Sequence, residues 1–284
     1  VLVPVEKVAK DKGKKSVKFS DLDVQEVERL RALAEEKLRA QTKKVLSQKE
    51  ERKTEVLKDQ IKGQDGKAVT EKNAERYVKE TLAPKMVIEE DPVVAQDGKP
   101  RLKVKVKISM APDHLRIRAK RHERQVGLYA KKYGLAPELI YAMIHTESCF
   151  NPLAKSQAPA FGLMQLMPRY GAREAYGFLY KEEKIVPPDY LYDPDNNIML
   201  GATYLNMLLT RHYGRIKDPA NRQALSIAAY NCGPTRVNKD ILSRGDPNAM
   251  SPAEVMGMIR KFAPKETQYY VPRVQERMAL YRDL

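Results

Sequence analysis

The hydrophobic pattern of the chain changes its period near Pro112, and this change limits the possible fold more than any other feature. Just before that point apolar residues alternate with lysines, as in a half-buried strand with a basic outer row. The strand residues are Leu102, Lys103, Val104, Lys105, Val106, Lys107 and Ile108. After Pro112 the pattern is helical to the end of the sequence, with breaks at clusters of Gly, Pro and Asn. The sequence therefore predicts an α+β protein with a small basic α+β domain, residues 1–110, and an all-α domain, residues 111–284.

The N-terminal domain should begin with a long amphipathic helix. Ser20 and Asp21 offer an N-cap, and apolar residues at three- and four-residue steps predict a helix that runs to about Lys58. Residues 1–19 show no periodicity, so we expect them to be flexible or loosely attached. The later patterns predict a second helix and two short strands, over residues 70–82, 86–88 and 93–95.

The net charge is strongly positive, because 52 lysines and arginines exceed 37 aspartates and glutamates by 15. Polyanions are the natural partners of such a chain. Acidic residues are mixed among the basic ones, and aromatic residues do not cluster with them. The charge therefore predicts long-range attraction to an anionic polymer and no nucleic-acid partner. No run of about 18 apolar residues occurs, so we expect no membrane-spanning helix.

We expect neither a metal nor another cofactor. The four histidines are scattered and do not form the H-E-x-x-H pattern of zinc enzymes. Asp193, Asp195 and Asn197 have the spacing that opens a calcium loop. However, Ile198 stands where that loop requires glycine. The two cysteines are too few for a disulfide scaffold or a thiolate zinc site.

Glu147 is notable because it lies on the apolar face of its own predicted helix. Pro137 suits the first position of that helix. Ile140, Ile144 and Glu147 then follow at i, i+4 and i+7. A carboxylate in this place must form an ion pair, face a solvated cleft, or stay protonated because it is desolvated. A general acid needs the last state near neutral pH, but the spacing alone is equally compatible with a buried ion pair.

Five segments after Pro112 follow one another in an order and spacing typical of a known family. They read TESCFNPLAKS, AFGLMQLMP, LYDPDNNIMLGATYL, AAYNCGP and QYYVPRV. Together they resemble the signature segments of lytic transglycosylases, in the superfamily of soluble lytic transglycosylases and goose-type lysozymes. The flanking stretch HLRIRAKRHERQVGLYAKKYGLAPELI, with a basic domain before it, is most similar to the subfamily of membrane-bound lytic murein transglycosylases C. The resemblance implies that the all-α domain is a lysozyme-like catalytic domain.

The resemblance also implies roles for individual residues. The glutamate of E-S-x-x-N-P is the single catalytic acid/base of this family, which here is Glu147. Tyr230 of the A-Y-N segment is implied to take part in catalysis by donating a hydrogen bond near that carboxylate. The residues implied to bind substrate are Ser156, Gly162, Met164, Gln165, Asn231 and Tyr270. Pro159-Ala160 stands where the family usually has Gly-Ala, so we expect a stiffer loop after Ser156.

The implied reaction is cleavage of the β-1,4 bond between N-acetylmuramic acid and N-acetylglucosamine in peptidoglycan, with formation of 1,6-anhydro-N-acetylmuramic acid. One carboxylate suffices because the sugar's N-acetyl group and its own 6-hydroxyl replace the second carboxylate and the water of ordinary glycosidases. The alternatives are a goose-type, lysozyme-like muramidase that hydrolyses the same bond, and a non-catalytic peptidoglycan-binding protein. The resemblance further implies the periplasm of a Gram-negative bacterium, with outer-membrane anchoring through a lipidated N-terminus absent from this sequence.

A disulfide between Cys149 and Cys232 is a further hypothesis. Both cysteines lie next to residues that must converge on one site, and the periplasm permits oxidation. Two free buried thiols explain the same sequence equally well.

Overall fold

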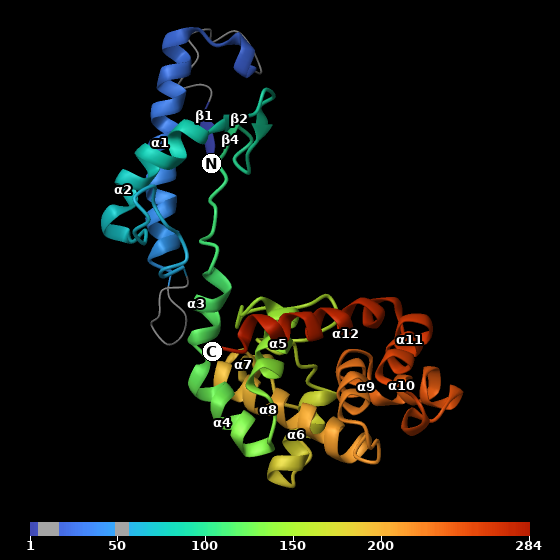
Figure 1. Cartoon of the computed structure of the whole chain (residues 1–284). Helices are drawn as coiled ribbons and strands as arrows, with labels where there is room; N and C mark the ends of the chain where they lie inside the picture. The colour runs from blue at the N-terminus through green and yellow to red at the C-terminus, as the bar shows by residue number, and fades with distance from the viewer. Residues whose placement is uncertain (5–16, 49–56) are drawn as a thin grey trace. The chain divides into compact units, whose positions relative to one another are not determined.

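The computed structural model describes residues 1–4, 17–48 and 57–284 of the chain (Figure 1). These residues form two compact units, Val1–Ile117 and Arg118–Leu284. Most of the described residues are helical, and a small four-stranded antiparallel sheet accompanies the helices. This combination confirms the predicted α+β class. In the described parts of the chain, no helix is both long and apolar enough to cross a membrane.

The sheet lies in the first unit and is organised around strand β4. The strands are β1 (Leu2–Pro4), β2 (Val87–Ile88), β3 (Val93–Val94) and β4 (Pro100–Lys105). Strand β4 pairs antiparallel with each of the other three. Its Leu102 and Val104 are buried, as their alternation with lysine predicts, and Val3 of β1 lies opposite Leu102. These apolar side chains face Leu30 and Ala34 of the first helix and form one core with them.

The edges of this sheet differ from the sequence-based expectation. Among residues 1–4, expected to be loosely attached, Leu2–Pro4 form strand β1, and the Val1 amino group donates to the Val104 carbonyl at 2.7 Å. Val17 is also buried in the core of this unit, whereas residues 5–16 lie outside the described residues. Strand β4 ends at Lys105 because its partner β2 supplies only two residues there, so Lys107 does not extend the basic row.

The basic row on β4 is also less free than the sequence implies. Glu89 follows β2 directly and forms ion pairs with both Lys103 and Lys105, the former at 3.8 Å between Nζ and Oε2. These pairs are solvent-exposed and each contributes little to stability. They do, however, offset part of the positive charge of this face.

Helix α1 (Val24–Leu46) begins later than predicted. Asp23 caps it in place of Ser20 or Asp21, because the Asp23 carboxylate accepts from the Glu26 amide at 2.8 Å. The Glu26 carboxylate in turn accepts from the Asp23 amide at 3.0 Å, which completes a capping box. The helix ends at Leu46 and not near Lys58; residues 49–56 of the predicted extension lie outside the described residues.

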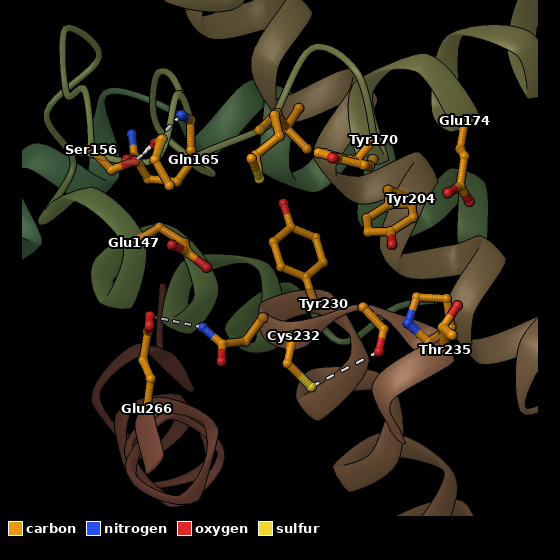
Figure 2. A pocket seen from close by; sticks show the side chains of 18 residues that line it. Glu147, Ser156, Gln165, Tyr170, Glu174, Tyr204, Tyr230, Cys232, Thr235 and Glu266 are labelled. Carbon is orange, nitrogen blue, oxygen red and sulfur yellow. Dashed lines mark hydrogen bonds between the residues drawn. The ribbon is translucent and has the colours of Figure 1, made fainter. Parts of the chain in front are cut away.

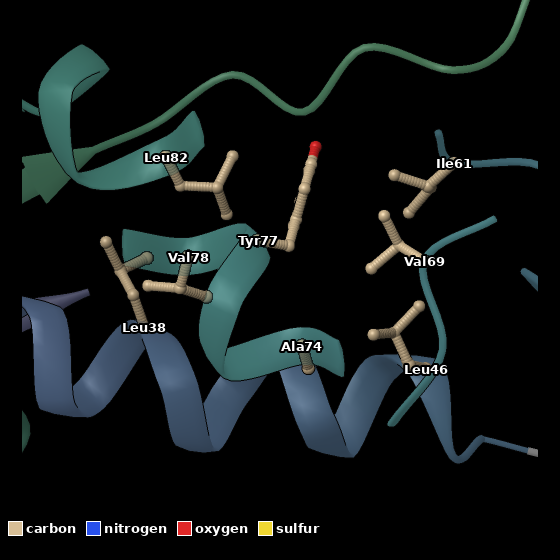
Figure 3. Packing of buried hydrophobic residues seen from close by; sticks show 8 residues of the cluster. All are labelled: Leu38, Leu46, Ile61, Val69, Ala74, Tyr77, Val78 and Leu82. Carbon is tan, nitrogen blue, oxygen red and sulfur yellow. The ribbon is translucent and has the colours of Figure 1, made fainter. Parts of the chain in front are cut away.

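A second apolar cluster joins α1 to the segment predicted as the second helix (Figure 3). That segment is helical throughout but changes its pitch. Its parts are η2 (Glu71–Asn73), α2 (Ala74–Tyr77), the π-helical η3 (Val78–Leu82) and η4 (Ala83–Lys85). The cluster consists of Leu38, Leu46, Ile61, Val69, Ala74, Tyr77, Val78 and Leu82. Each large apolar side chain buried in this way contributes about 1.5–3 kcal/mol to folding, so this cluster gives the first unit a core of its own.

The second unit is built from helices joined by short irregular segments. Helix α3 (His114–Lys120) spans the boundary between the units. The longer helices that follow are α4 (Glu123–Tyr133), α5 (Pro137–Ser148), α6 (Gly171–Tyr180), α7 (Pro188–Tyr192), α8 (Pro194–Met207), α9 (Pro219–Cys232), α10 (Pro234–Asp240), α11 (Pro252–Phe262) and α12 (Lys265–Met278). Single turns of other helix types in this unit are η5 (Leu208–His212), η6 (Leu242–Arg244), η7 (Pro247–Ala249) and η8 (Ala279–Tyr281), and the first unit contains η1 (Phe19–Asp21).

Proline fixes where many of these helices begin. It occupies the first helical position, where no intrahelical donor is lost, in α5, α8, α9 and α11 among others. Helix α8 is buried on nearly all sides and packs against α4, α6, α7 and α9. Helix α5 packs against α4 on one side and extensively against α12 on the other. This packing places the end of α5 inside the unit, and the predicted acid Glu147 lies in its last turn.

Candidate active site

Glu147 leaves the core of the second unit at the end of α5. Ile140, Met143 and Ile144, on the preceding turns, are fully buried. The helix ends in a left-handed residue, Cys149 (φ 50°), and the Ser148 hydroxyl donates to the Leu163 carbonyl at 2.8 Å. This hydrogen bond holds the end of the helix against the following loop and so fixes the environment of the half-buried Glu147 side chain.

The Glu147 carboxylate opens into a cavity of about 550 Å³ (Figure 2). Its walls come from α5, the loop between α5 and α6, and helices α6, α8, α9, α10 and α12. The lining includes Ser156, Gln165, Tyr170, Glu174, Tyr204, Tyr230, Asn231, Cys232 and Glu266. Polar and aromatic side chains of this kind, spread along a cleft, suit a carbohydrate chain.

The environment raises the pKa of Glu147 to about 7. Burial is the main cause, because desolvation disfavours the ionised carboxylate. A hydrogen bond donated by the Tyr270 hydroxyl acts in the opposite direction, and the negative charge of Glu266 raises the pKa further. Among the described residues, no lysine or arginine forms an ion pair with Glu147. Within the described parts of the chain, the carboxyl of Glu147 is therefore not in the buried ion pair that the sequence left open.

The two tyrosines near Glu147 make hydrogen bonds that differ from the expected ones. Tyr270, expected to bind substrate, is buried and donates its hydrogen bond to Glu147 Oε1. Tyr230, expected to donate near the carboxylate, lines the cavity but donates to the Met164 carbonyl at 2.9 Å. Burial and the nearby Glu147 charge hold the pKa of both hydroxyls well above the ordinary value, so both remain donors.

Asn231 holds a second carboxylate in the cavity. Its amide nitrogen donates to Glu266 Oε1 at 3.1 Å, and its amide oxygen accepts from the Thr267 hydroxyl at 2.6 Å. Asn231 lines the cavity as expected of a binding residue, but it also fixes Glu266. Glu266 is absent from the residues singled out by sequence. Its position four residues before Tyr270, one turn away on α12, is the signal that could have identified it.

Gly162 and Met164 lie behind the cavity and do not line it. A Cβ at Gly162, where φ is +76°, would lie 2.1 Å from the Leu191 carbonyl oxygen, so the glycine is needed for close packing. Met164 is fully buried, and its sulfur occupies the space beside Gly201 of α8. These two residues therefore support the site from within the core, and the methionine that faces the cavity is Met167.

The loop that carries these residues is held by Asn197 of α8. Its amide nitrogen donates to the carbonyls of Phe161 and Leu191 at 2.9 and 2.7 Å. Its amide oxygen accepts from the Met164 amide at 2.7 Å. In the D-x-D-x-N motif, Asp193 thus caps α8 by accepting from the Asn196 amide, and Asn197 anchors the loop. Among the described residues, no group of three or more His, Cys, Asp or Glu is placed to hold a metal ion.

Gln165 and Ser156 both line the cavity and are both tied to their own loop. Gln165 has a positive φ of 46°, and its amide nitrogen donates to the carbonyls of Ala154 and Gly162 at 3.0 and 2.8 Å. The Ser156 hydroxyl donates to the Ala158 carbonyl and accepts from the Ala160 amide at 3.3 Å. These bonds give the loop after Ser156 internal support.

The disulfide hypothesis is wrong for this structure. Cys149 and Cys232 are both free, the first exposed and the second half-buried. Cys149 forms the left-handed end of α5, whereas Cys232 lines the cavity. Each cysteine lies near a site residue in the sequence, Cys149 near Glu147 and Cys232 near Tyr230. The side chains of residues close in sequence point in different directions, so the thiols do not meet even though the site residues do.

This chain matches a known protein family and is similar to curated proteins. Residues 125–248 match the family described as Transglycosylase SLT domain. The membrane-bound lytic murein transglycosylase C of Serratia proteamaculans is 34% identical over 183 residues, which are 62% of this chain and 51% of that protein. The protein of the same name from Haemophilus ducreyi is 38% identical over 136 residues, covering 47% and 36%. The chain thus spans about half the length, or less, of these curated relatives.

Solved structures are also similar to this chain. The lytic transglycosylase Slt of Pseudomonas aeruginosa, as an inactive mutant, has 30% identity and a TM-score of 0.46, covering 56% of this chain and 24% of that one. The 70-kDa soluble lytic transglycosylase of Escherichia coli has 28% identity and a TM-score of 0.46, covering 60% and 25%. The sequence matches confirm the predicted resemblance to lytic transglycosylases, including the membrane-bound subfamily C.

Proposed function

We propose that this chain is a peptidoglycan lytic transglycosylase that cleaves the β-1,4 bond between N-acetylmuramic acid and N-acetylglucosamine, with Glu147 as its general acid/base. The observation that carries the proposal is the state of Glu147. Its carboxyl has a pKa of about 7 and forms no ion pair with a cation among the described residues. It also lines the cavity. The transglycosylase family match covers the segment in which this carboxyl lies.

In the first step Glu147 acts as an acid. A pKa of about 7 leaves a large share of the carboxyl protonated at neutral pH, which a general acid requires. The proton passes to the glycosidic oxygen as the bond between that oxygen and the anomeric carbon breaks. The carbonyl oxygen of the muramic acid's N-acetyl group stabilises the positive charge that develops on the anomeric carbon. The Tyr270 hydrogen bond then stabilises the carboxylate that remains.

In the second step the same carboxylate acts as a base. It accepts the proton of the sugar's 6-hydroxyl while the oxygen of that hydroxyl forms a bond to the anomeric carbon. The product is a 1,6-anhydro sugar, Glu147 is protonated again, and no water is consumed. Because the attacking group belongs to the substrate, proximity replaces an external nucleophile.

Hydrolysis of the same bond by a muramidase is the second candidate. One observation favours it, namely that the cavity contains two further carboxylates, Glu174 and Glu266. Glu266 is held by Asn231 and acts electrostatically on Glu147. A second carboxylate of this kind could activate water in an ordinary glycosidase. The carboxylate count therefore does not decide between the two reactions, and the products must.

The experiment is digestion of purified peptidoglycan in water labelled with oxygen-18, followed by mass spectrometry of the released fragments. A lytic transglycosylase releases anhydro ends that are lighter than hydrolysed ends by one water and carry no label. A muramidase releases reducing ends that carry the label. A Glu147→Gln protein serves as the control, and release by this folded variant would remove Glu147 from the mechanism.

We propose the predicted domain of residues 1–110 as an accessory part and residues 111–284 as a lysozyme-like catalytic domain; the boundary between the two compact units lies seven residues later, after Ile117. The role of the accessory part, shared with the rest of the chain, would be attraction to the anionic wall polymer, and the total net charge of +15 of the whole chain supports such attraction. The relatives' names include "membrane-bound", which supports a place in the periplasm at the outer membrane. Lipid anchoring belongs to the same proposal.

A further inference from the structure

A second cavity adjoins the active-site cavity and has a different chemical character. Its volume is about 860 Å³, and it lies along α6 and the π-helical turn η5. Tyr170 and Glu174 line both cavities. In Figure 2 these two side chains lie on the far side of the active-site cavity from Glu147. We call the second space the α6 cavity, and it forms a continuation of the cleft away from the catalytic carboxyl.

Helix α6 forms a wall common to the two cavities. Tyr170, Glu174 and Phe178 follow one another at four-residue steps and therefore form a row along the helix. The first two members of this row face both cavities, and Phe178 lines the α6 cavity only. A chain bound in the active-site cavity thus has a continuous path along α6.

The lining of the α6 cavity contains four basic and three acidic side chains. The basic residues are Arg169, Arg173, Lys181 and Arg211, and the acidic residues are Glu174, Glu182 and Glu183. Arg173 forms an ion pair with Glu183 at 2.5 Å, which occupies one residue of each sign. Among the described residues, Arg169 and Arg211 form no ion pair. Two guanidinium groups are therefore available to an anionic ligand.

Phe178 holds two of the cations in place. The Arg211 guanidinium carbon lies 4.3 Å from the centre of the Phe178 ring, and the Lys181 ammonium lies 5.0 Å from it. The same ammonium donates to the Phe178 carbonyl at 3.0 Å. Stacking on an aromatic face leaves the edge of a guanidinium, with its donors, free for a carboxylate. Arg211 is thus oriented before any ligand arrives, which reduces the entropy lost on binding.

We propose that the α6 cavity binds a carboxylate of the peptide stem attached to the glycan strand, through Arg211 and Arg169. The inference rests on the proposed function, since it takes the glycan to occupy the cavity at Glu147. N-acetylated sugars whose lactyl group is joined to peptide are uncharged, whereas the peptide stem carries free carboxylates. Unpaired guanidinium groups beside the sugar cleft therefore match the stem and not the glycan. The two arginines select stem-bearing strands and do not touch the reacting bond.

The test compares two substrates and two double variants. The substrates are purified glycan strands with intact stems and the same strands after an amidase has removed the stems. The test variant is Arg169→Gln with Arg211→Gln. The control is Arg215→Gln with Arg260→Gln, which removes the same charge from exposed positions outside both cavities. Release of glycan fragments is measured as kcat and KM for each pair of enzyme and substrate.

The test variant should raise KM about tenfold on stem-bearing strands, leave kcat nearly unchanged, and behave as the wild type on naked strands. The control variant should match the wild type on both. Conversion of the stem carboxylates to amides should abolish the wild type's preference for stem-bearing strands. An equal loss on both substrates would assign the arginines to the glycan or to folding, and no loss would show that the α6 cavity does not bind the stem. Either outcome overturns the inference, whereas failure of the wild type to release anhydro ends from any strand would overturn the proposed function instead.

Discussion

Replacement of Tyr270 by Phe should move the pH dependence of catalysis upward. In the wild type Glu147 has a pKa of about 7, and in the proposed mechanism its protonated form is the active acid. The value of kcat/KM should therefore fall as the pH rises through about 7. The Tyr270 hydroxyl donates to the ionised carboxylate and favours that form. Without this donor the carboxyl keeps its proton to a higher pH, so the falling limb of the profile moves upward.

The size of the displacement follows from the strength of the lost bond. A hydrogen bond to a charged group contributes about 1.5–3 kcal/mol. One pH unit corresponds to about 1.4 kcal/mol, so the limb should move by roughly one to two pH units. The plateau at low pH should fall at the same time, because Tyr270 also fixes the direction of the carboxylate. The assay is the release of anhydro muropeptides between pH 5 and pH 9, fitted for the position of the limb.

Two variants control this experiment. Tyr269, next in the chain, is 67% exposed and does not line the cavity, so Tyr269→Phe should leave the profile unchanged. Glu266→Gln removes a negative charge that raises the pKa of Glu147, so its limb should move downward. A limb that stays in place or moves downward in Tyr270→Phe would refute the reasoning about the acid.

Three further predictions follow from the same contacts. Glu147→Gln should abolish cleavage. In the wild type the folded state binds a proton at Glu147 between pH 4.5 and about 7, so the free energy of unfolding falls as the pH rises through this window. In denaturant unfolding, the stability of the variant relative to the wild type should therefore increase by up to about 3 kcal/mol from pH 4 to pH 8, and a constant difference would contradict a raised pKa of Glu147. Tyr230→Phe removes a donor to the Met164 carbonyl and should slow turnover with little movement of the pH limb; a raised KM with unchanged kcat would instead mark Tyr230 as a contact to the bound sugar. Gly162→Ala should lower the free energy of unfolding by about 3 kcal/mol or more because its Cβ would overlap the Leu191 carbonyl oxygen. Gly127→Ala, at a position on α4 with open space around it, should raise the free energy of unfolding slightly. Equal effects of the two substitutions in chemical unfolding would exclude the packing argument.

The position of the acid could be predicted from the sequence because it depends on local structure. Pro137 begins α5, and the apolar period of that helix decides which face Glu147 occupies. The start of α1 had an equally local signal in the D-x-x-E box of Asp23 and Glu26, which lies two to three residues after the expected cap. Both features are fixed by residues within one or two helical turns.

The partners of the acid could not be predicted in the same way. Tyr230 and Tyr270 each stand in a signature segment, but the packing of α9 and α12 decides which hydroxyl reaches Glu147. Met164 is buried because Gly201 leaves space for its sulfur, 37 positions away in the sequence. The spacing of Glu266 from Tyr270 places both on one face of α12, but only the packing of α12 against α5 brings that face to Glu147. Such contacts depend on the tertiary arrangement and leave no periodic trace.

Helix α12 has a consequence for the order in which the proposed site can assemble. It packs against α5 and supplies Tyr270, which lies 123 residues after Glu147 in the chain. Before α12 docks against α5, the Tyr270 hydroxyl is not held at the Glu147 carboxyl. In the proposed mechanism the acid is therefore complete only after this contact between distant parts of the sequence has formed.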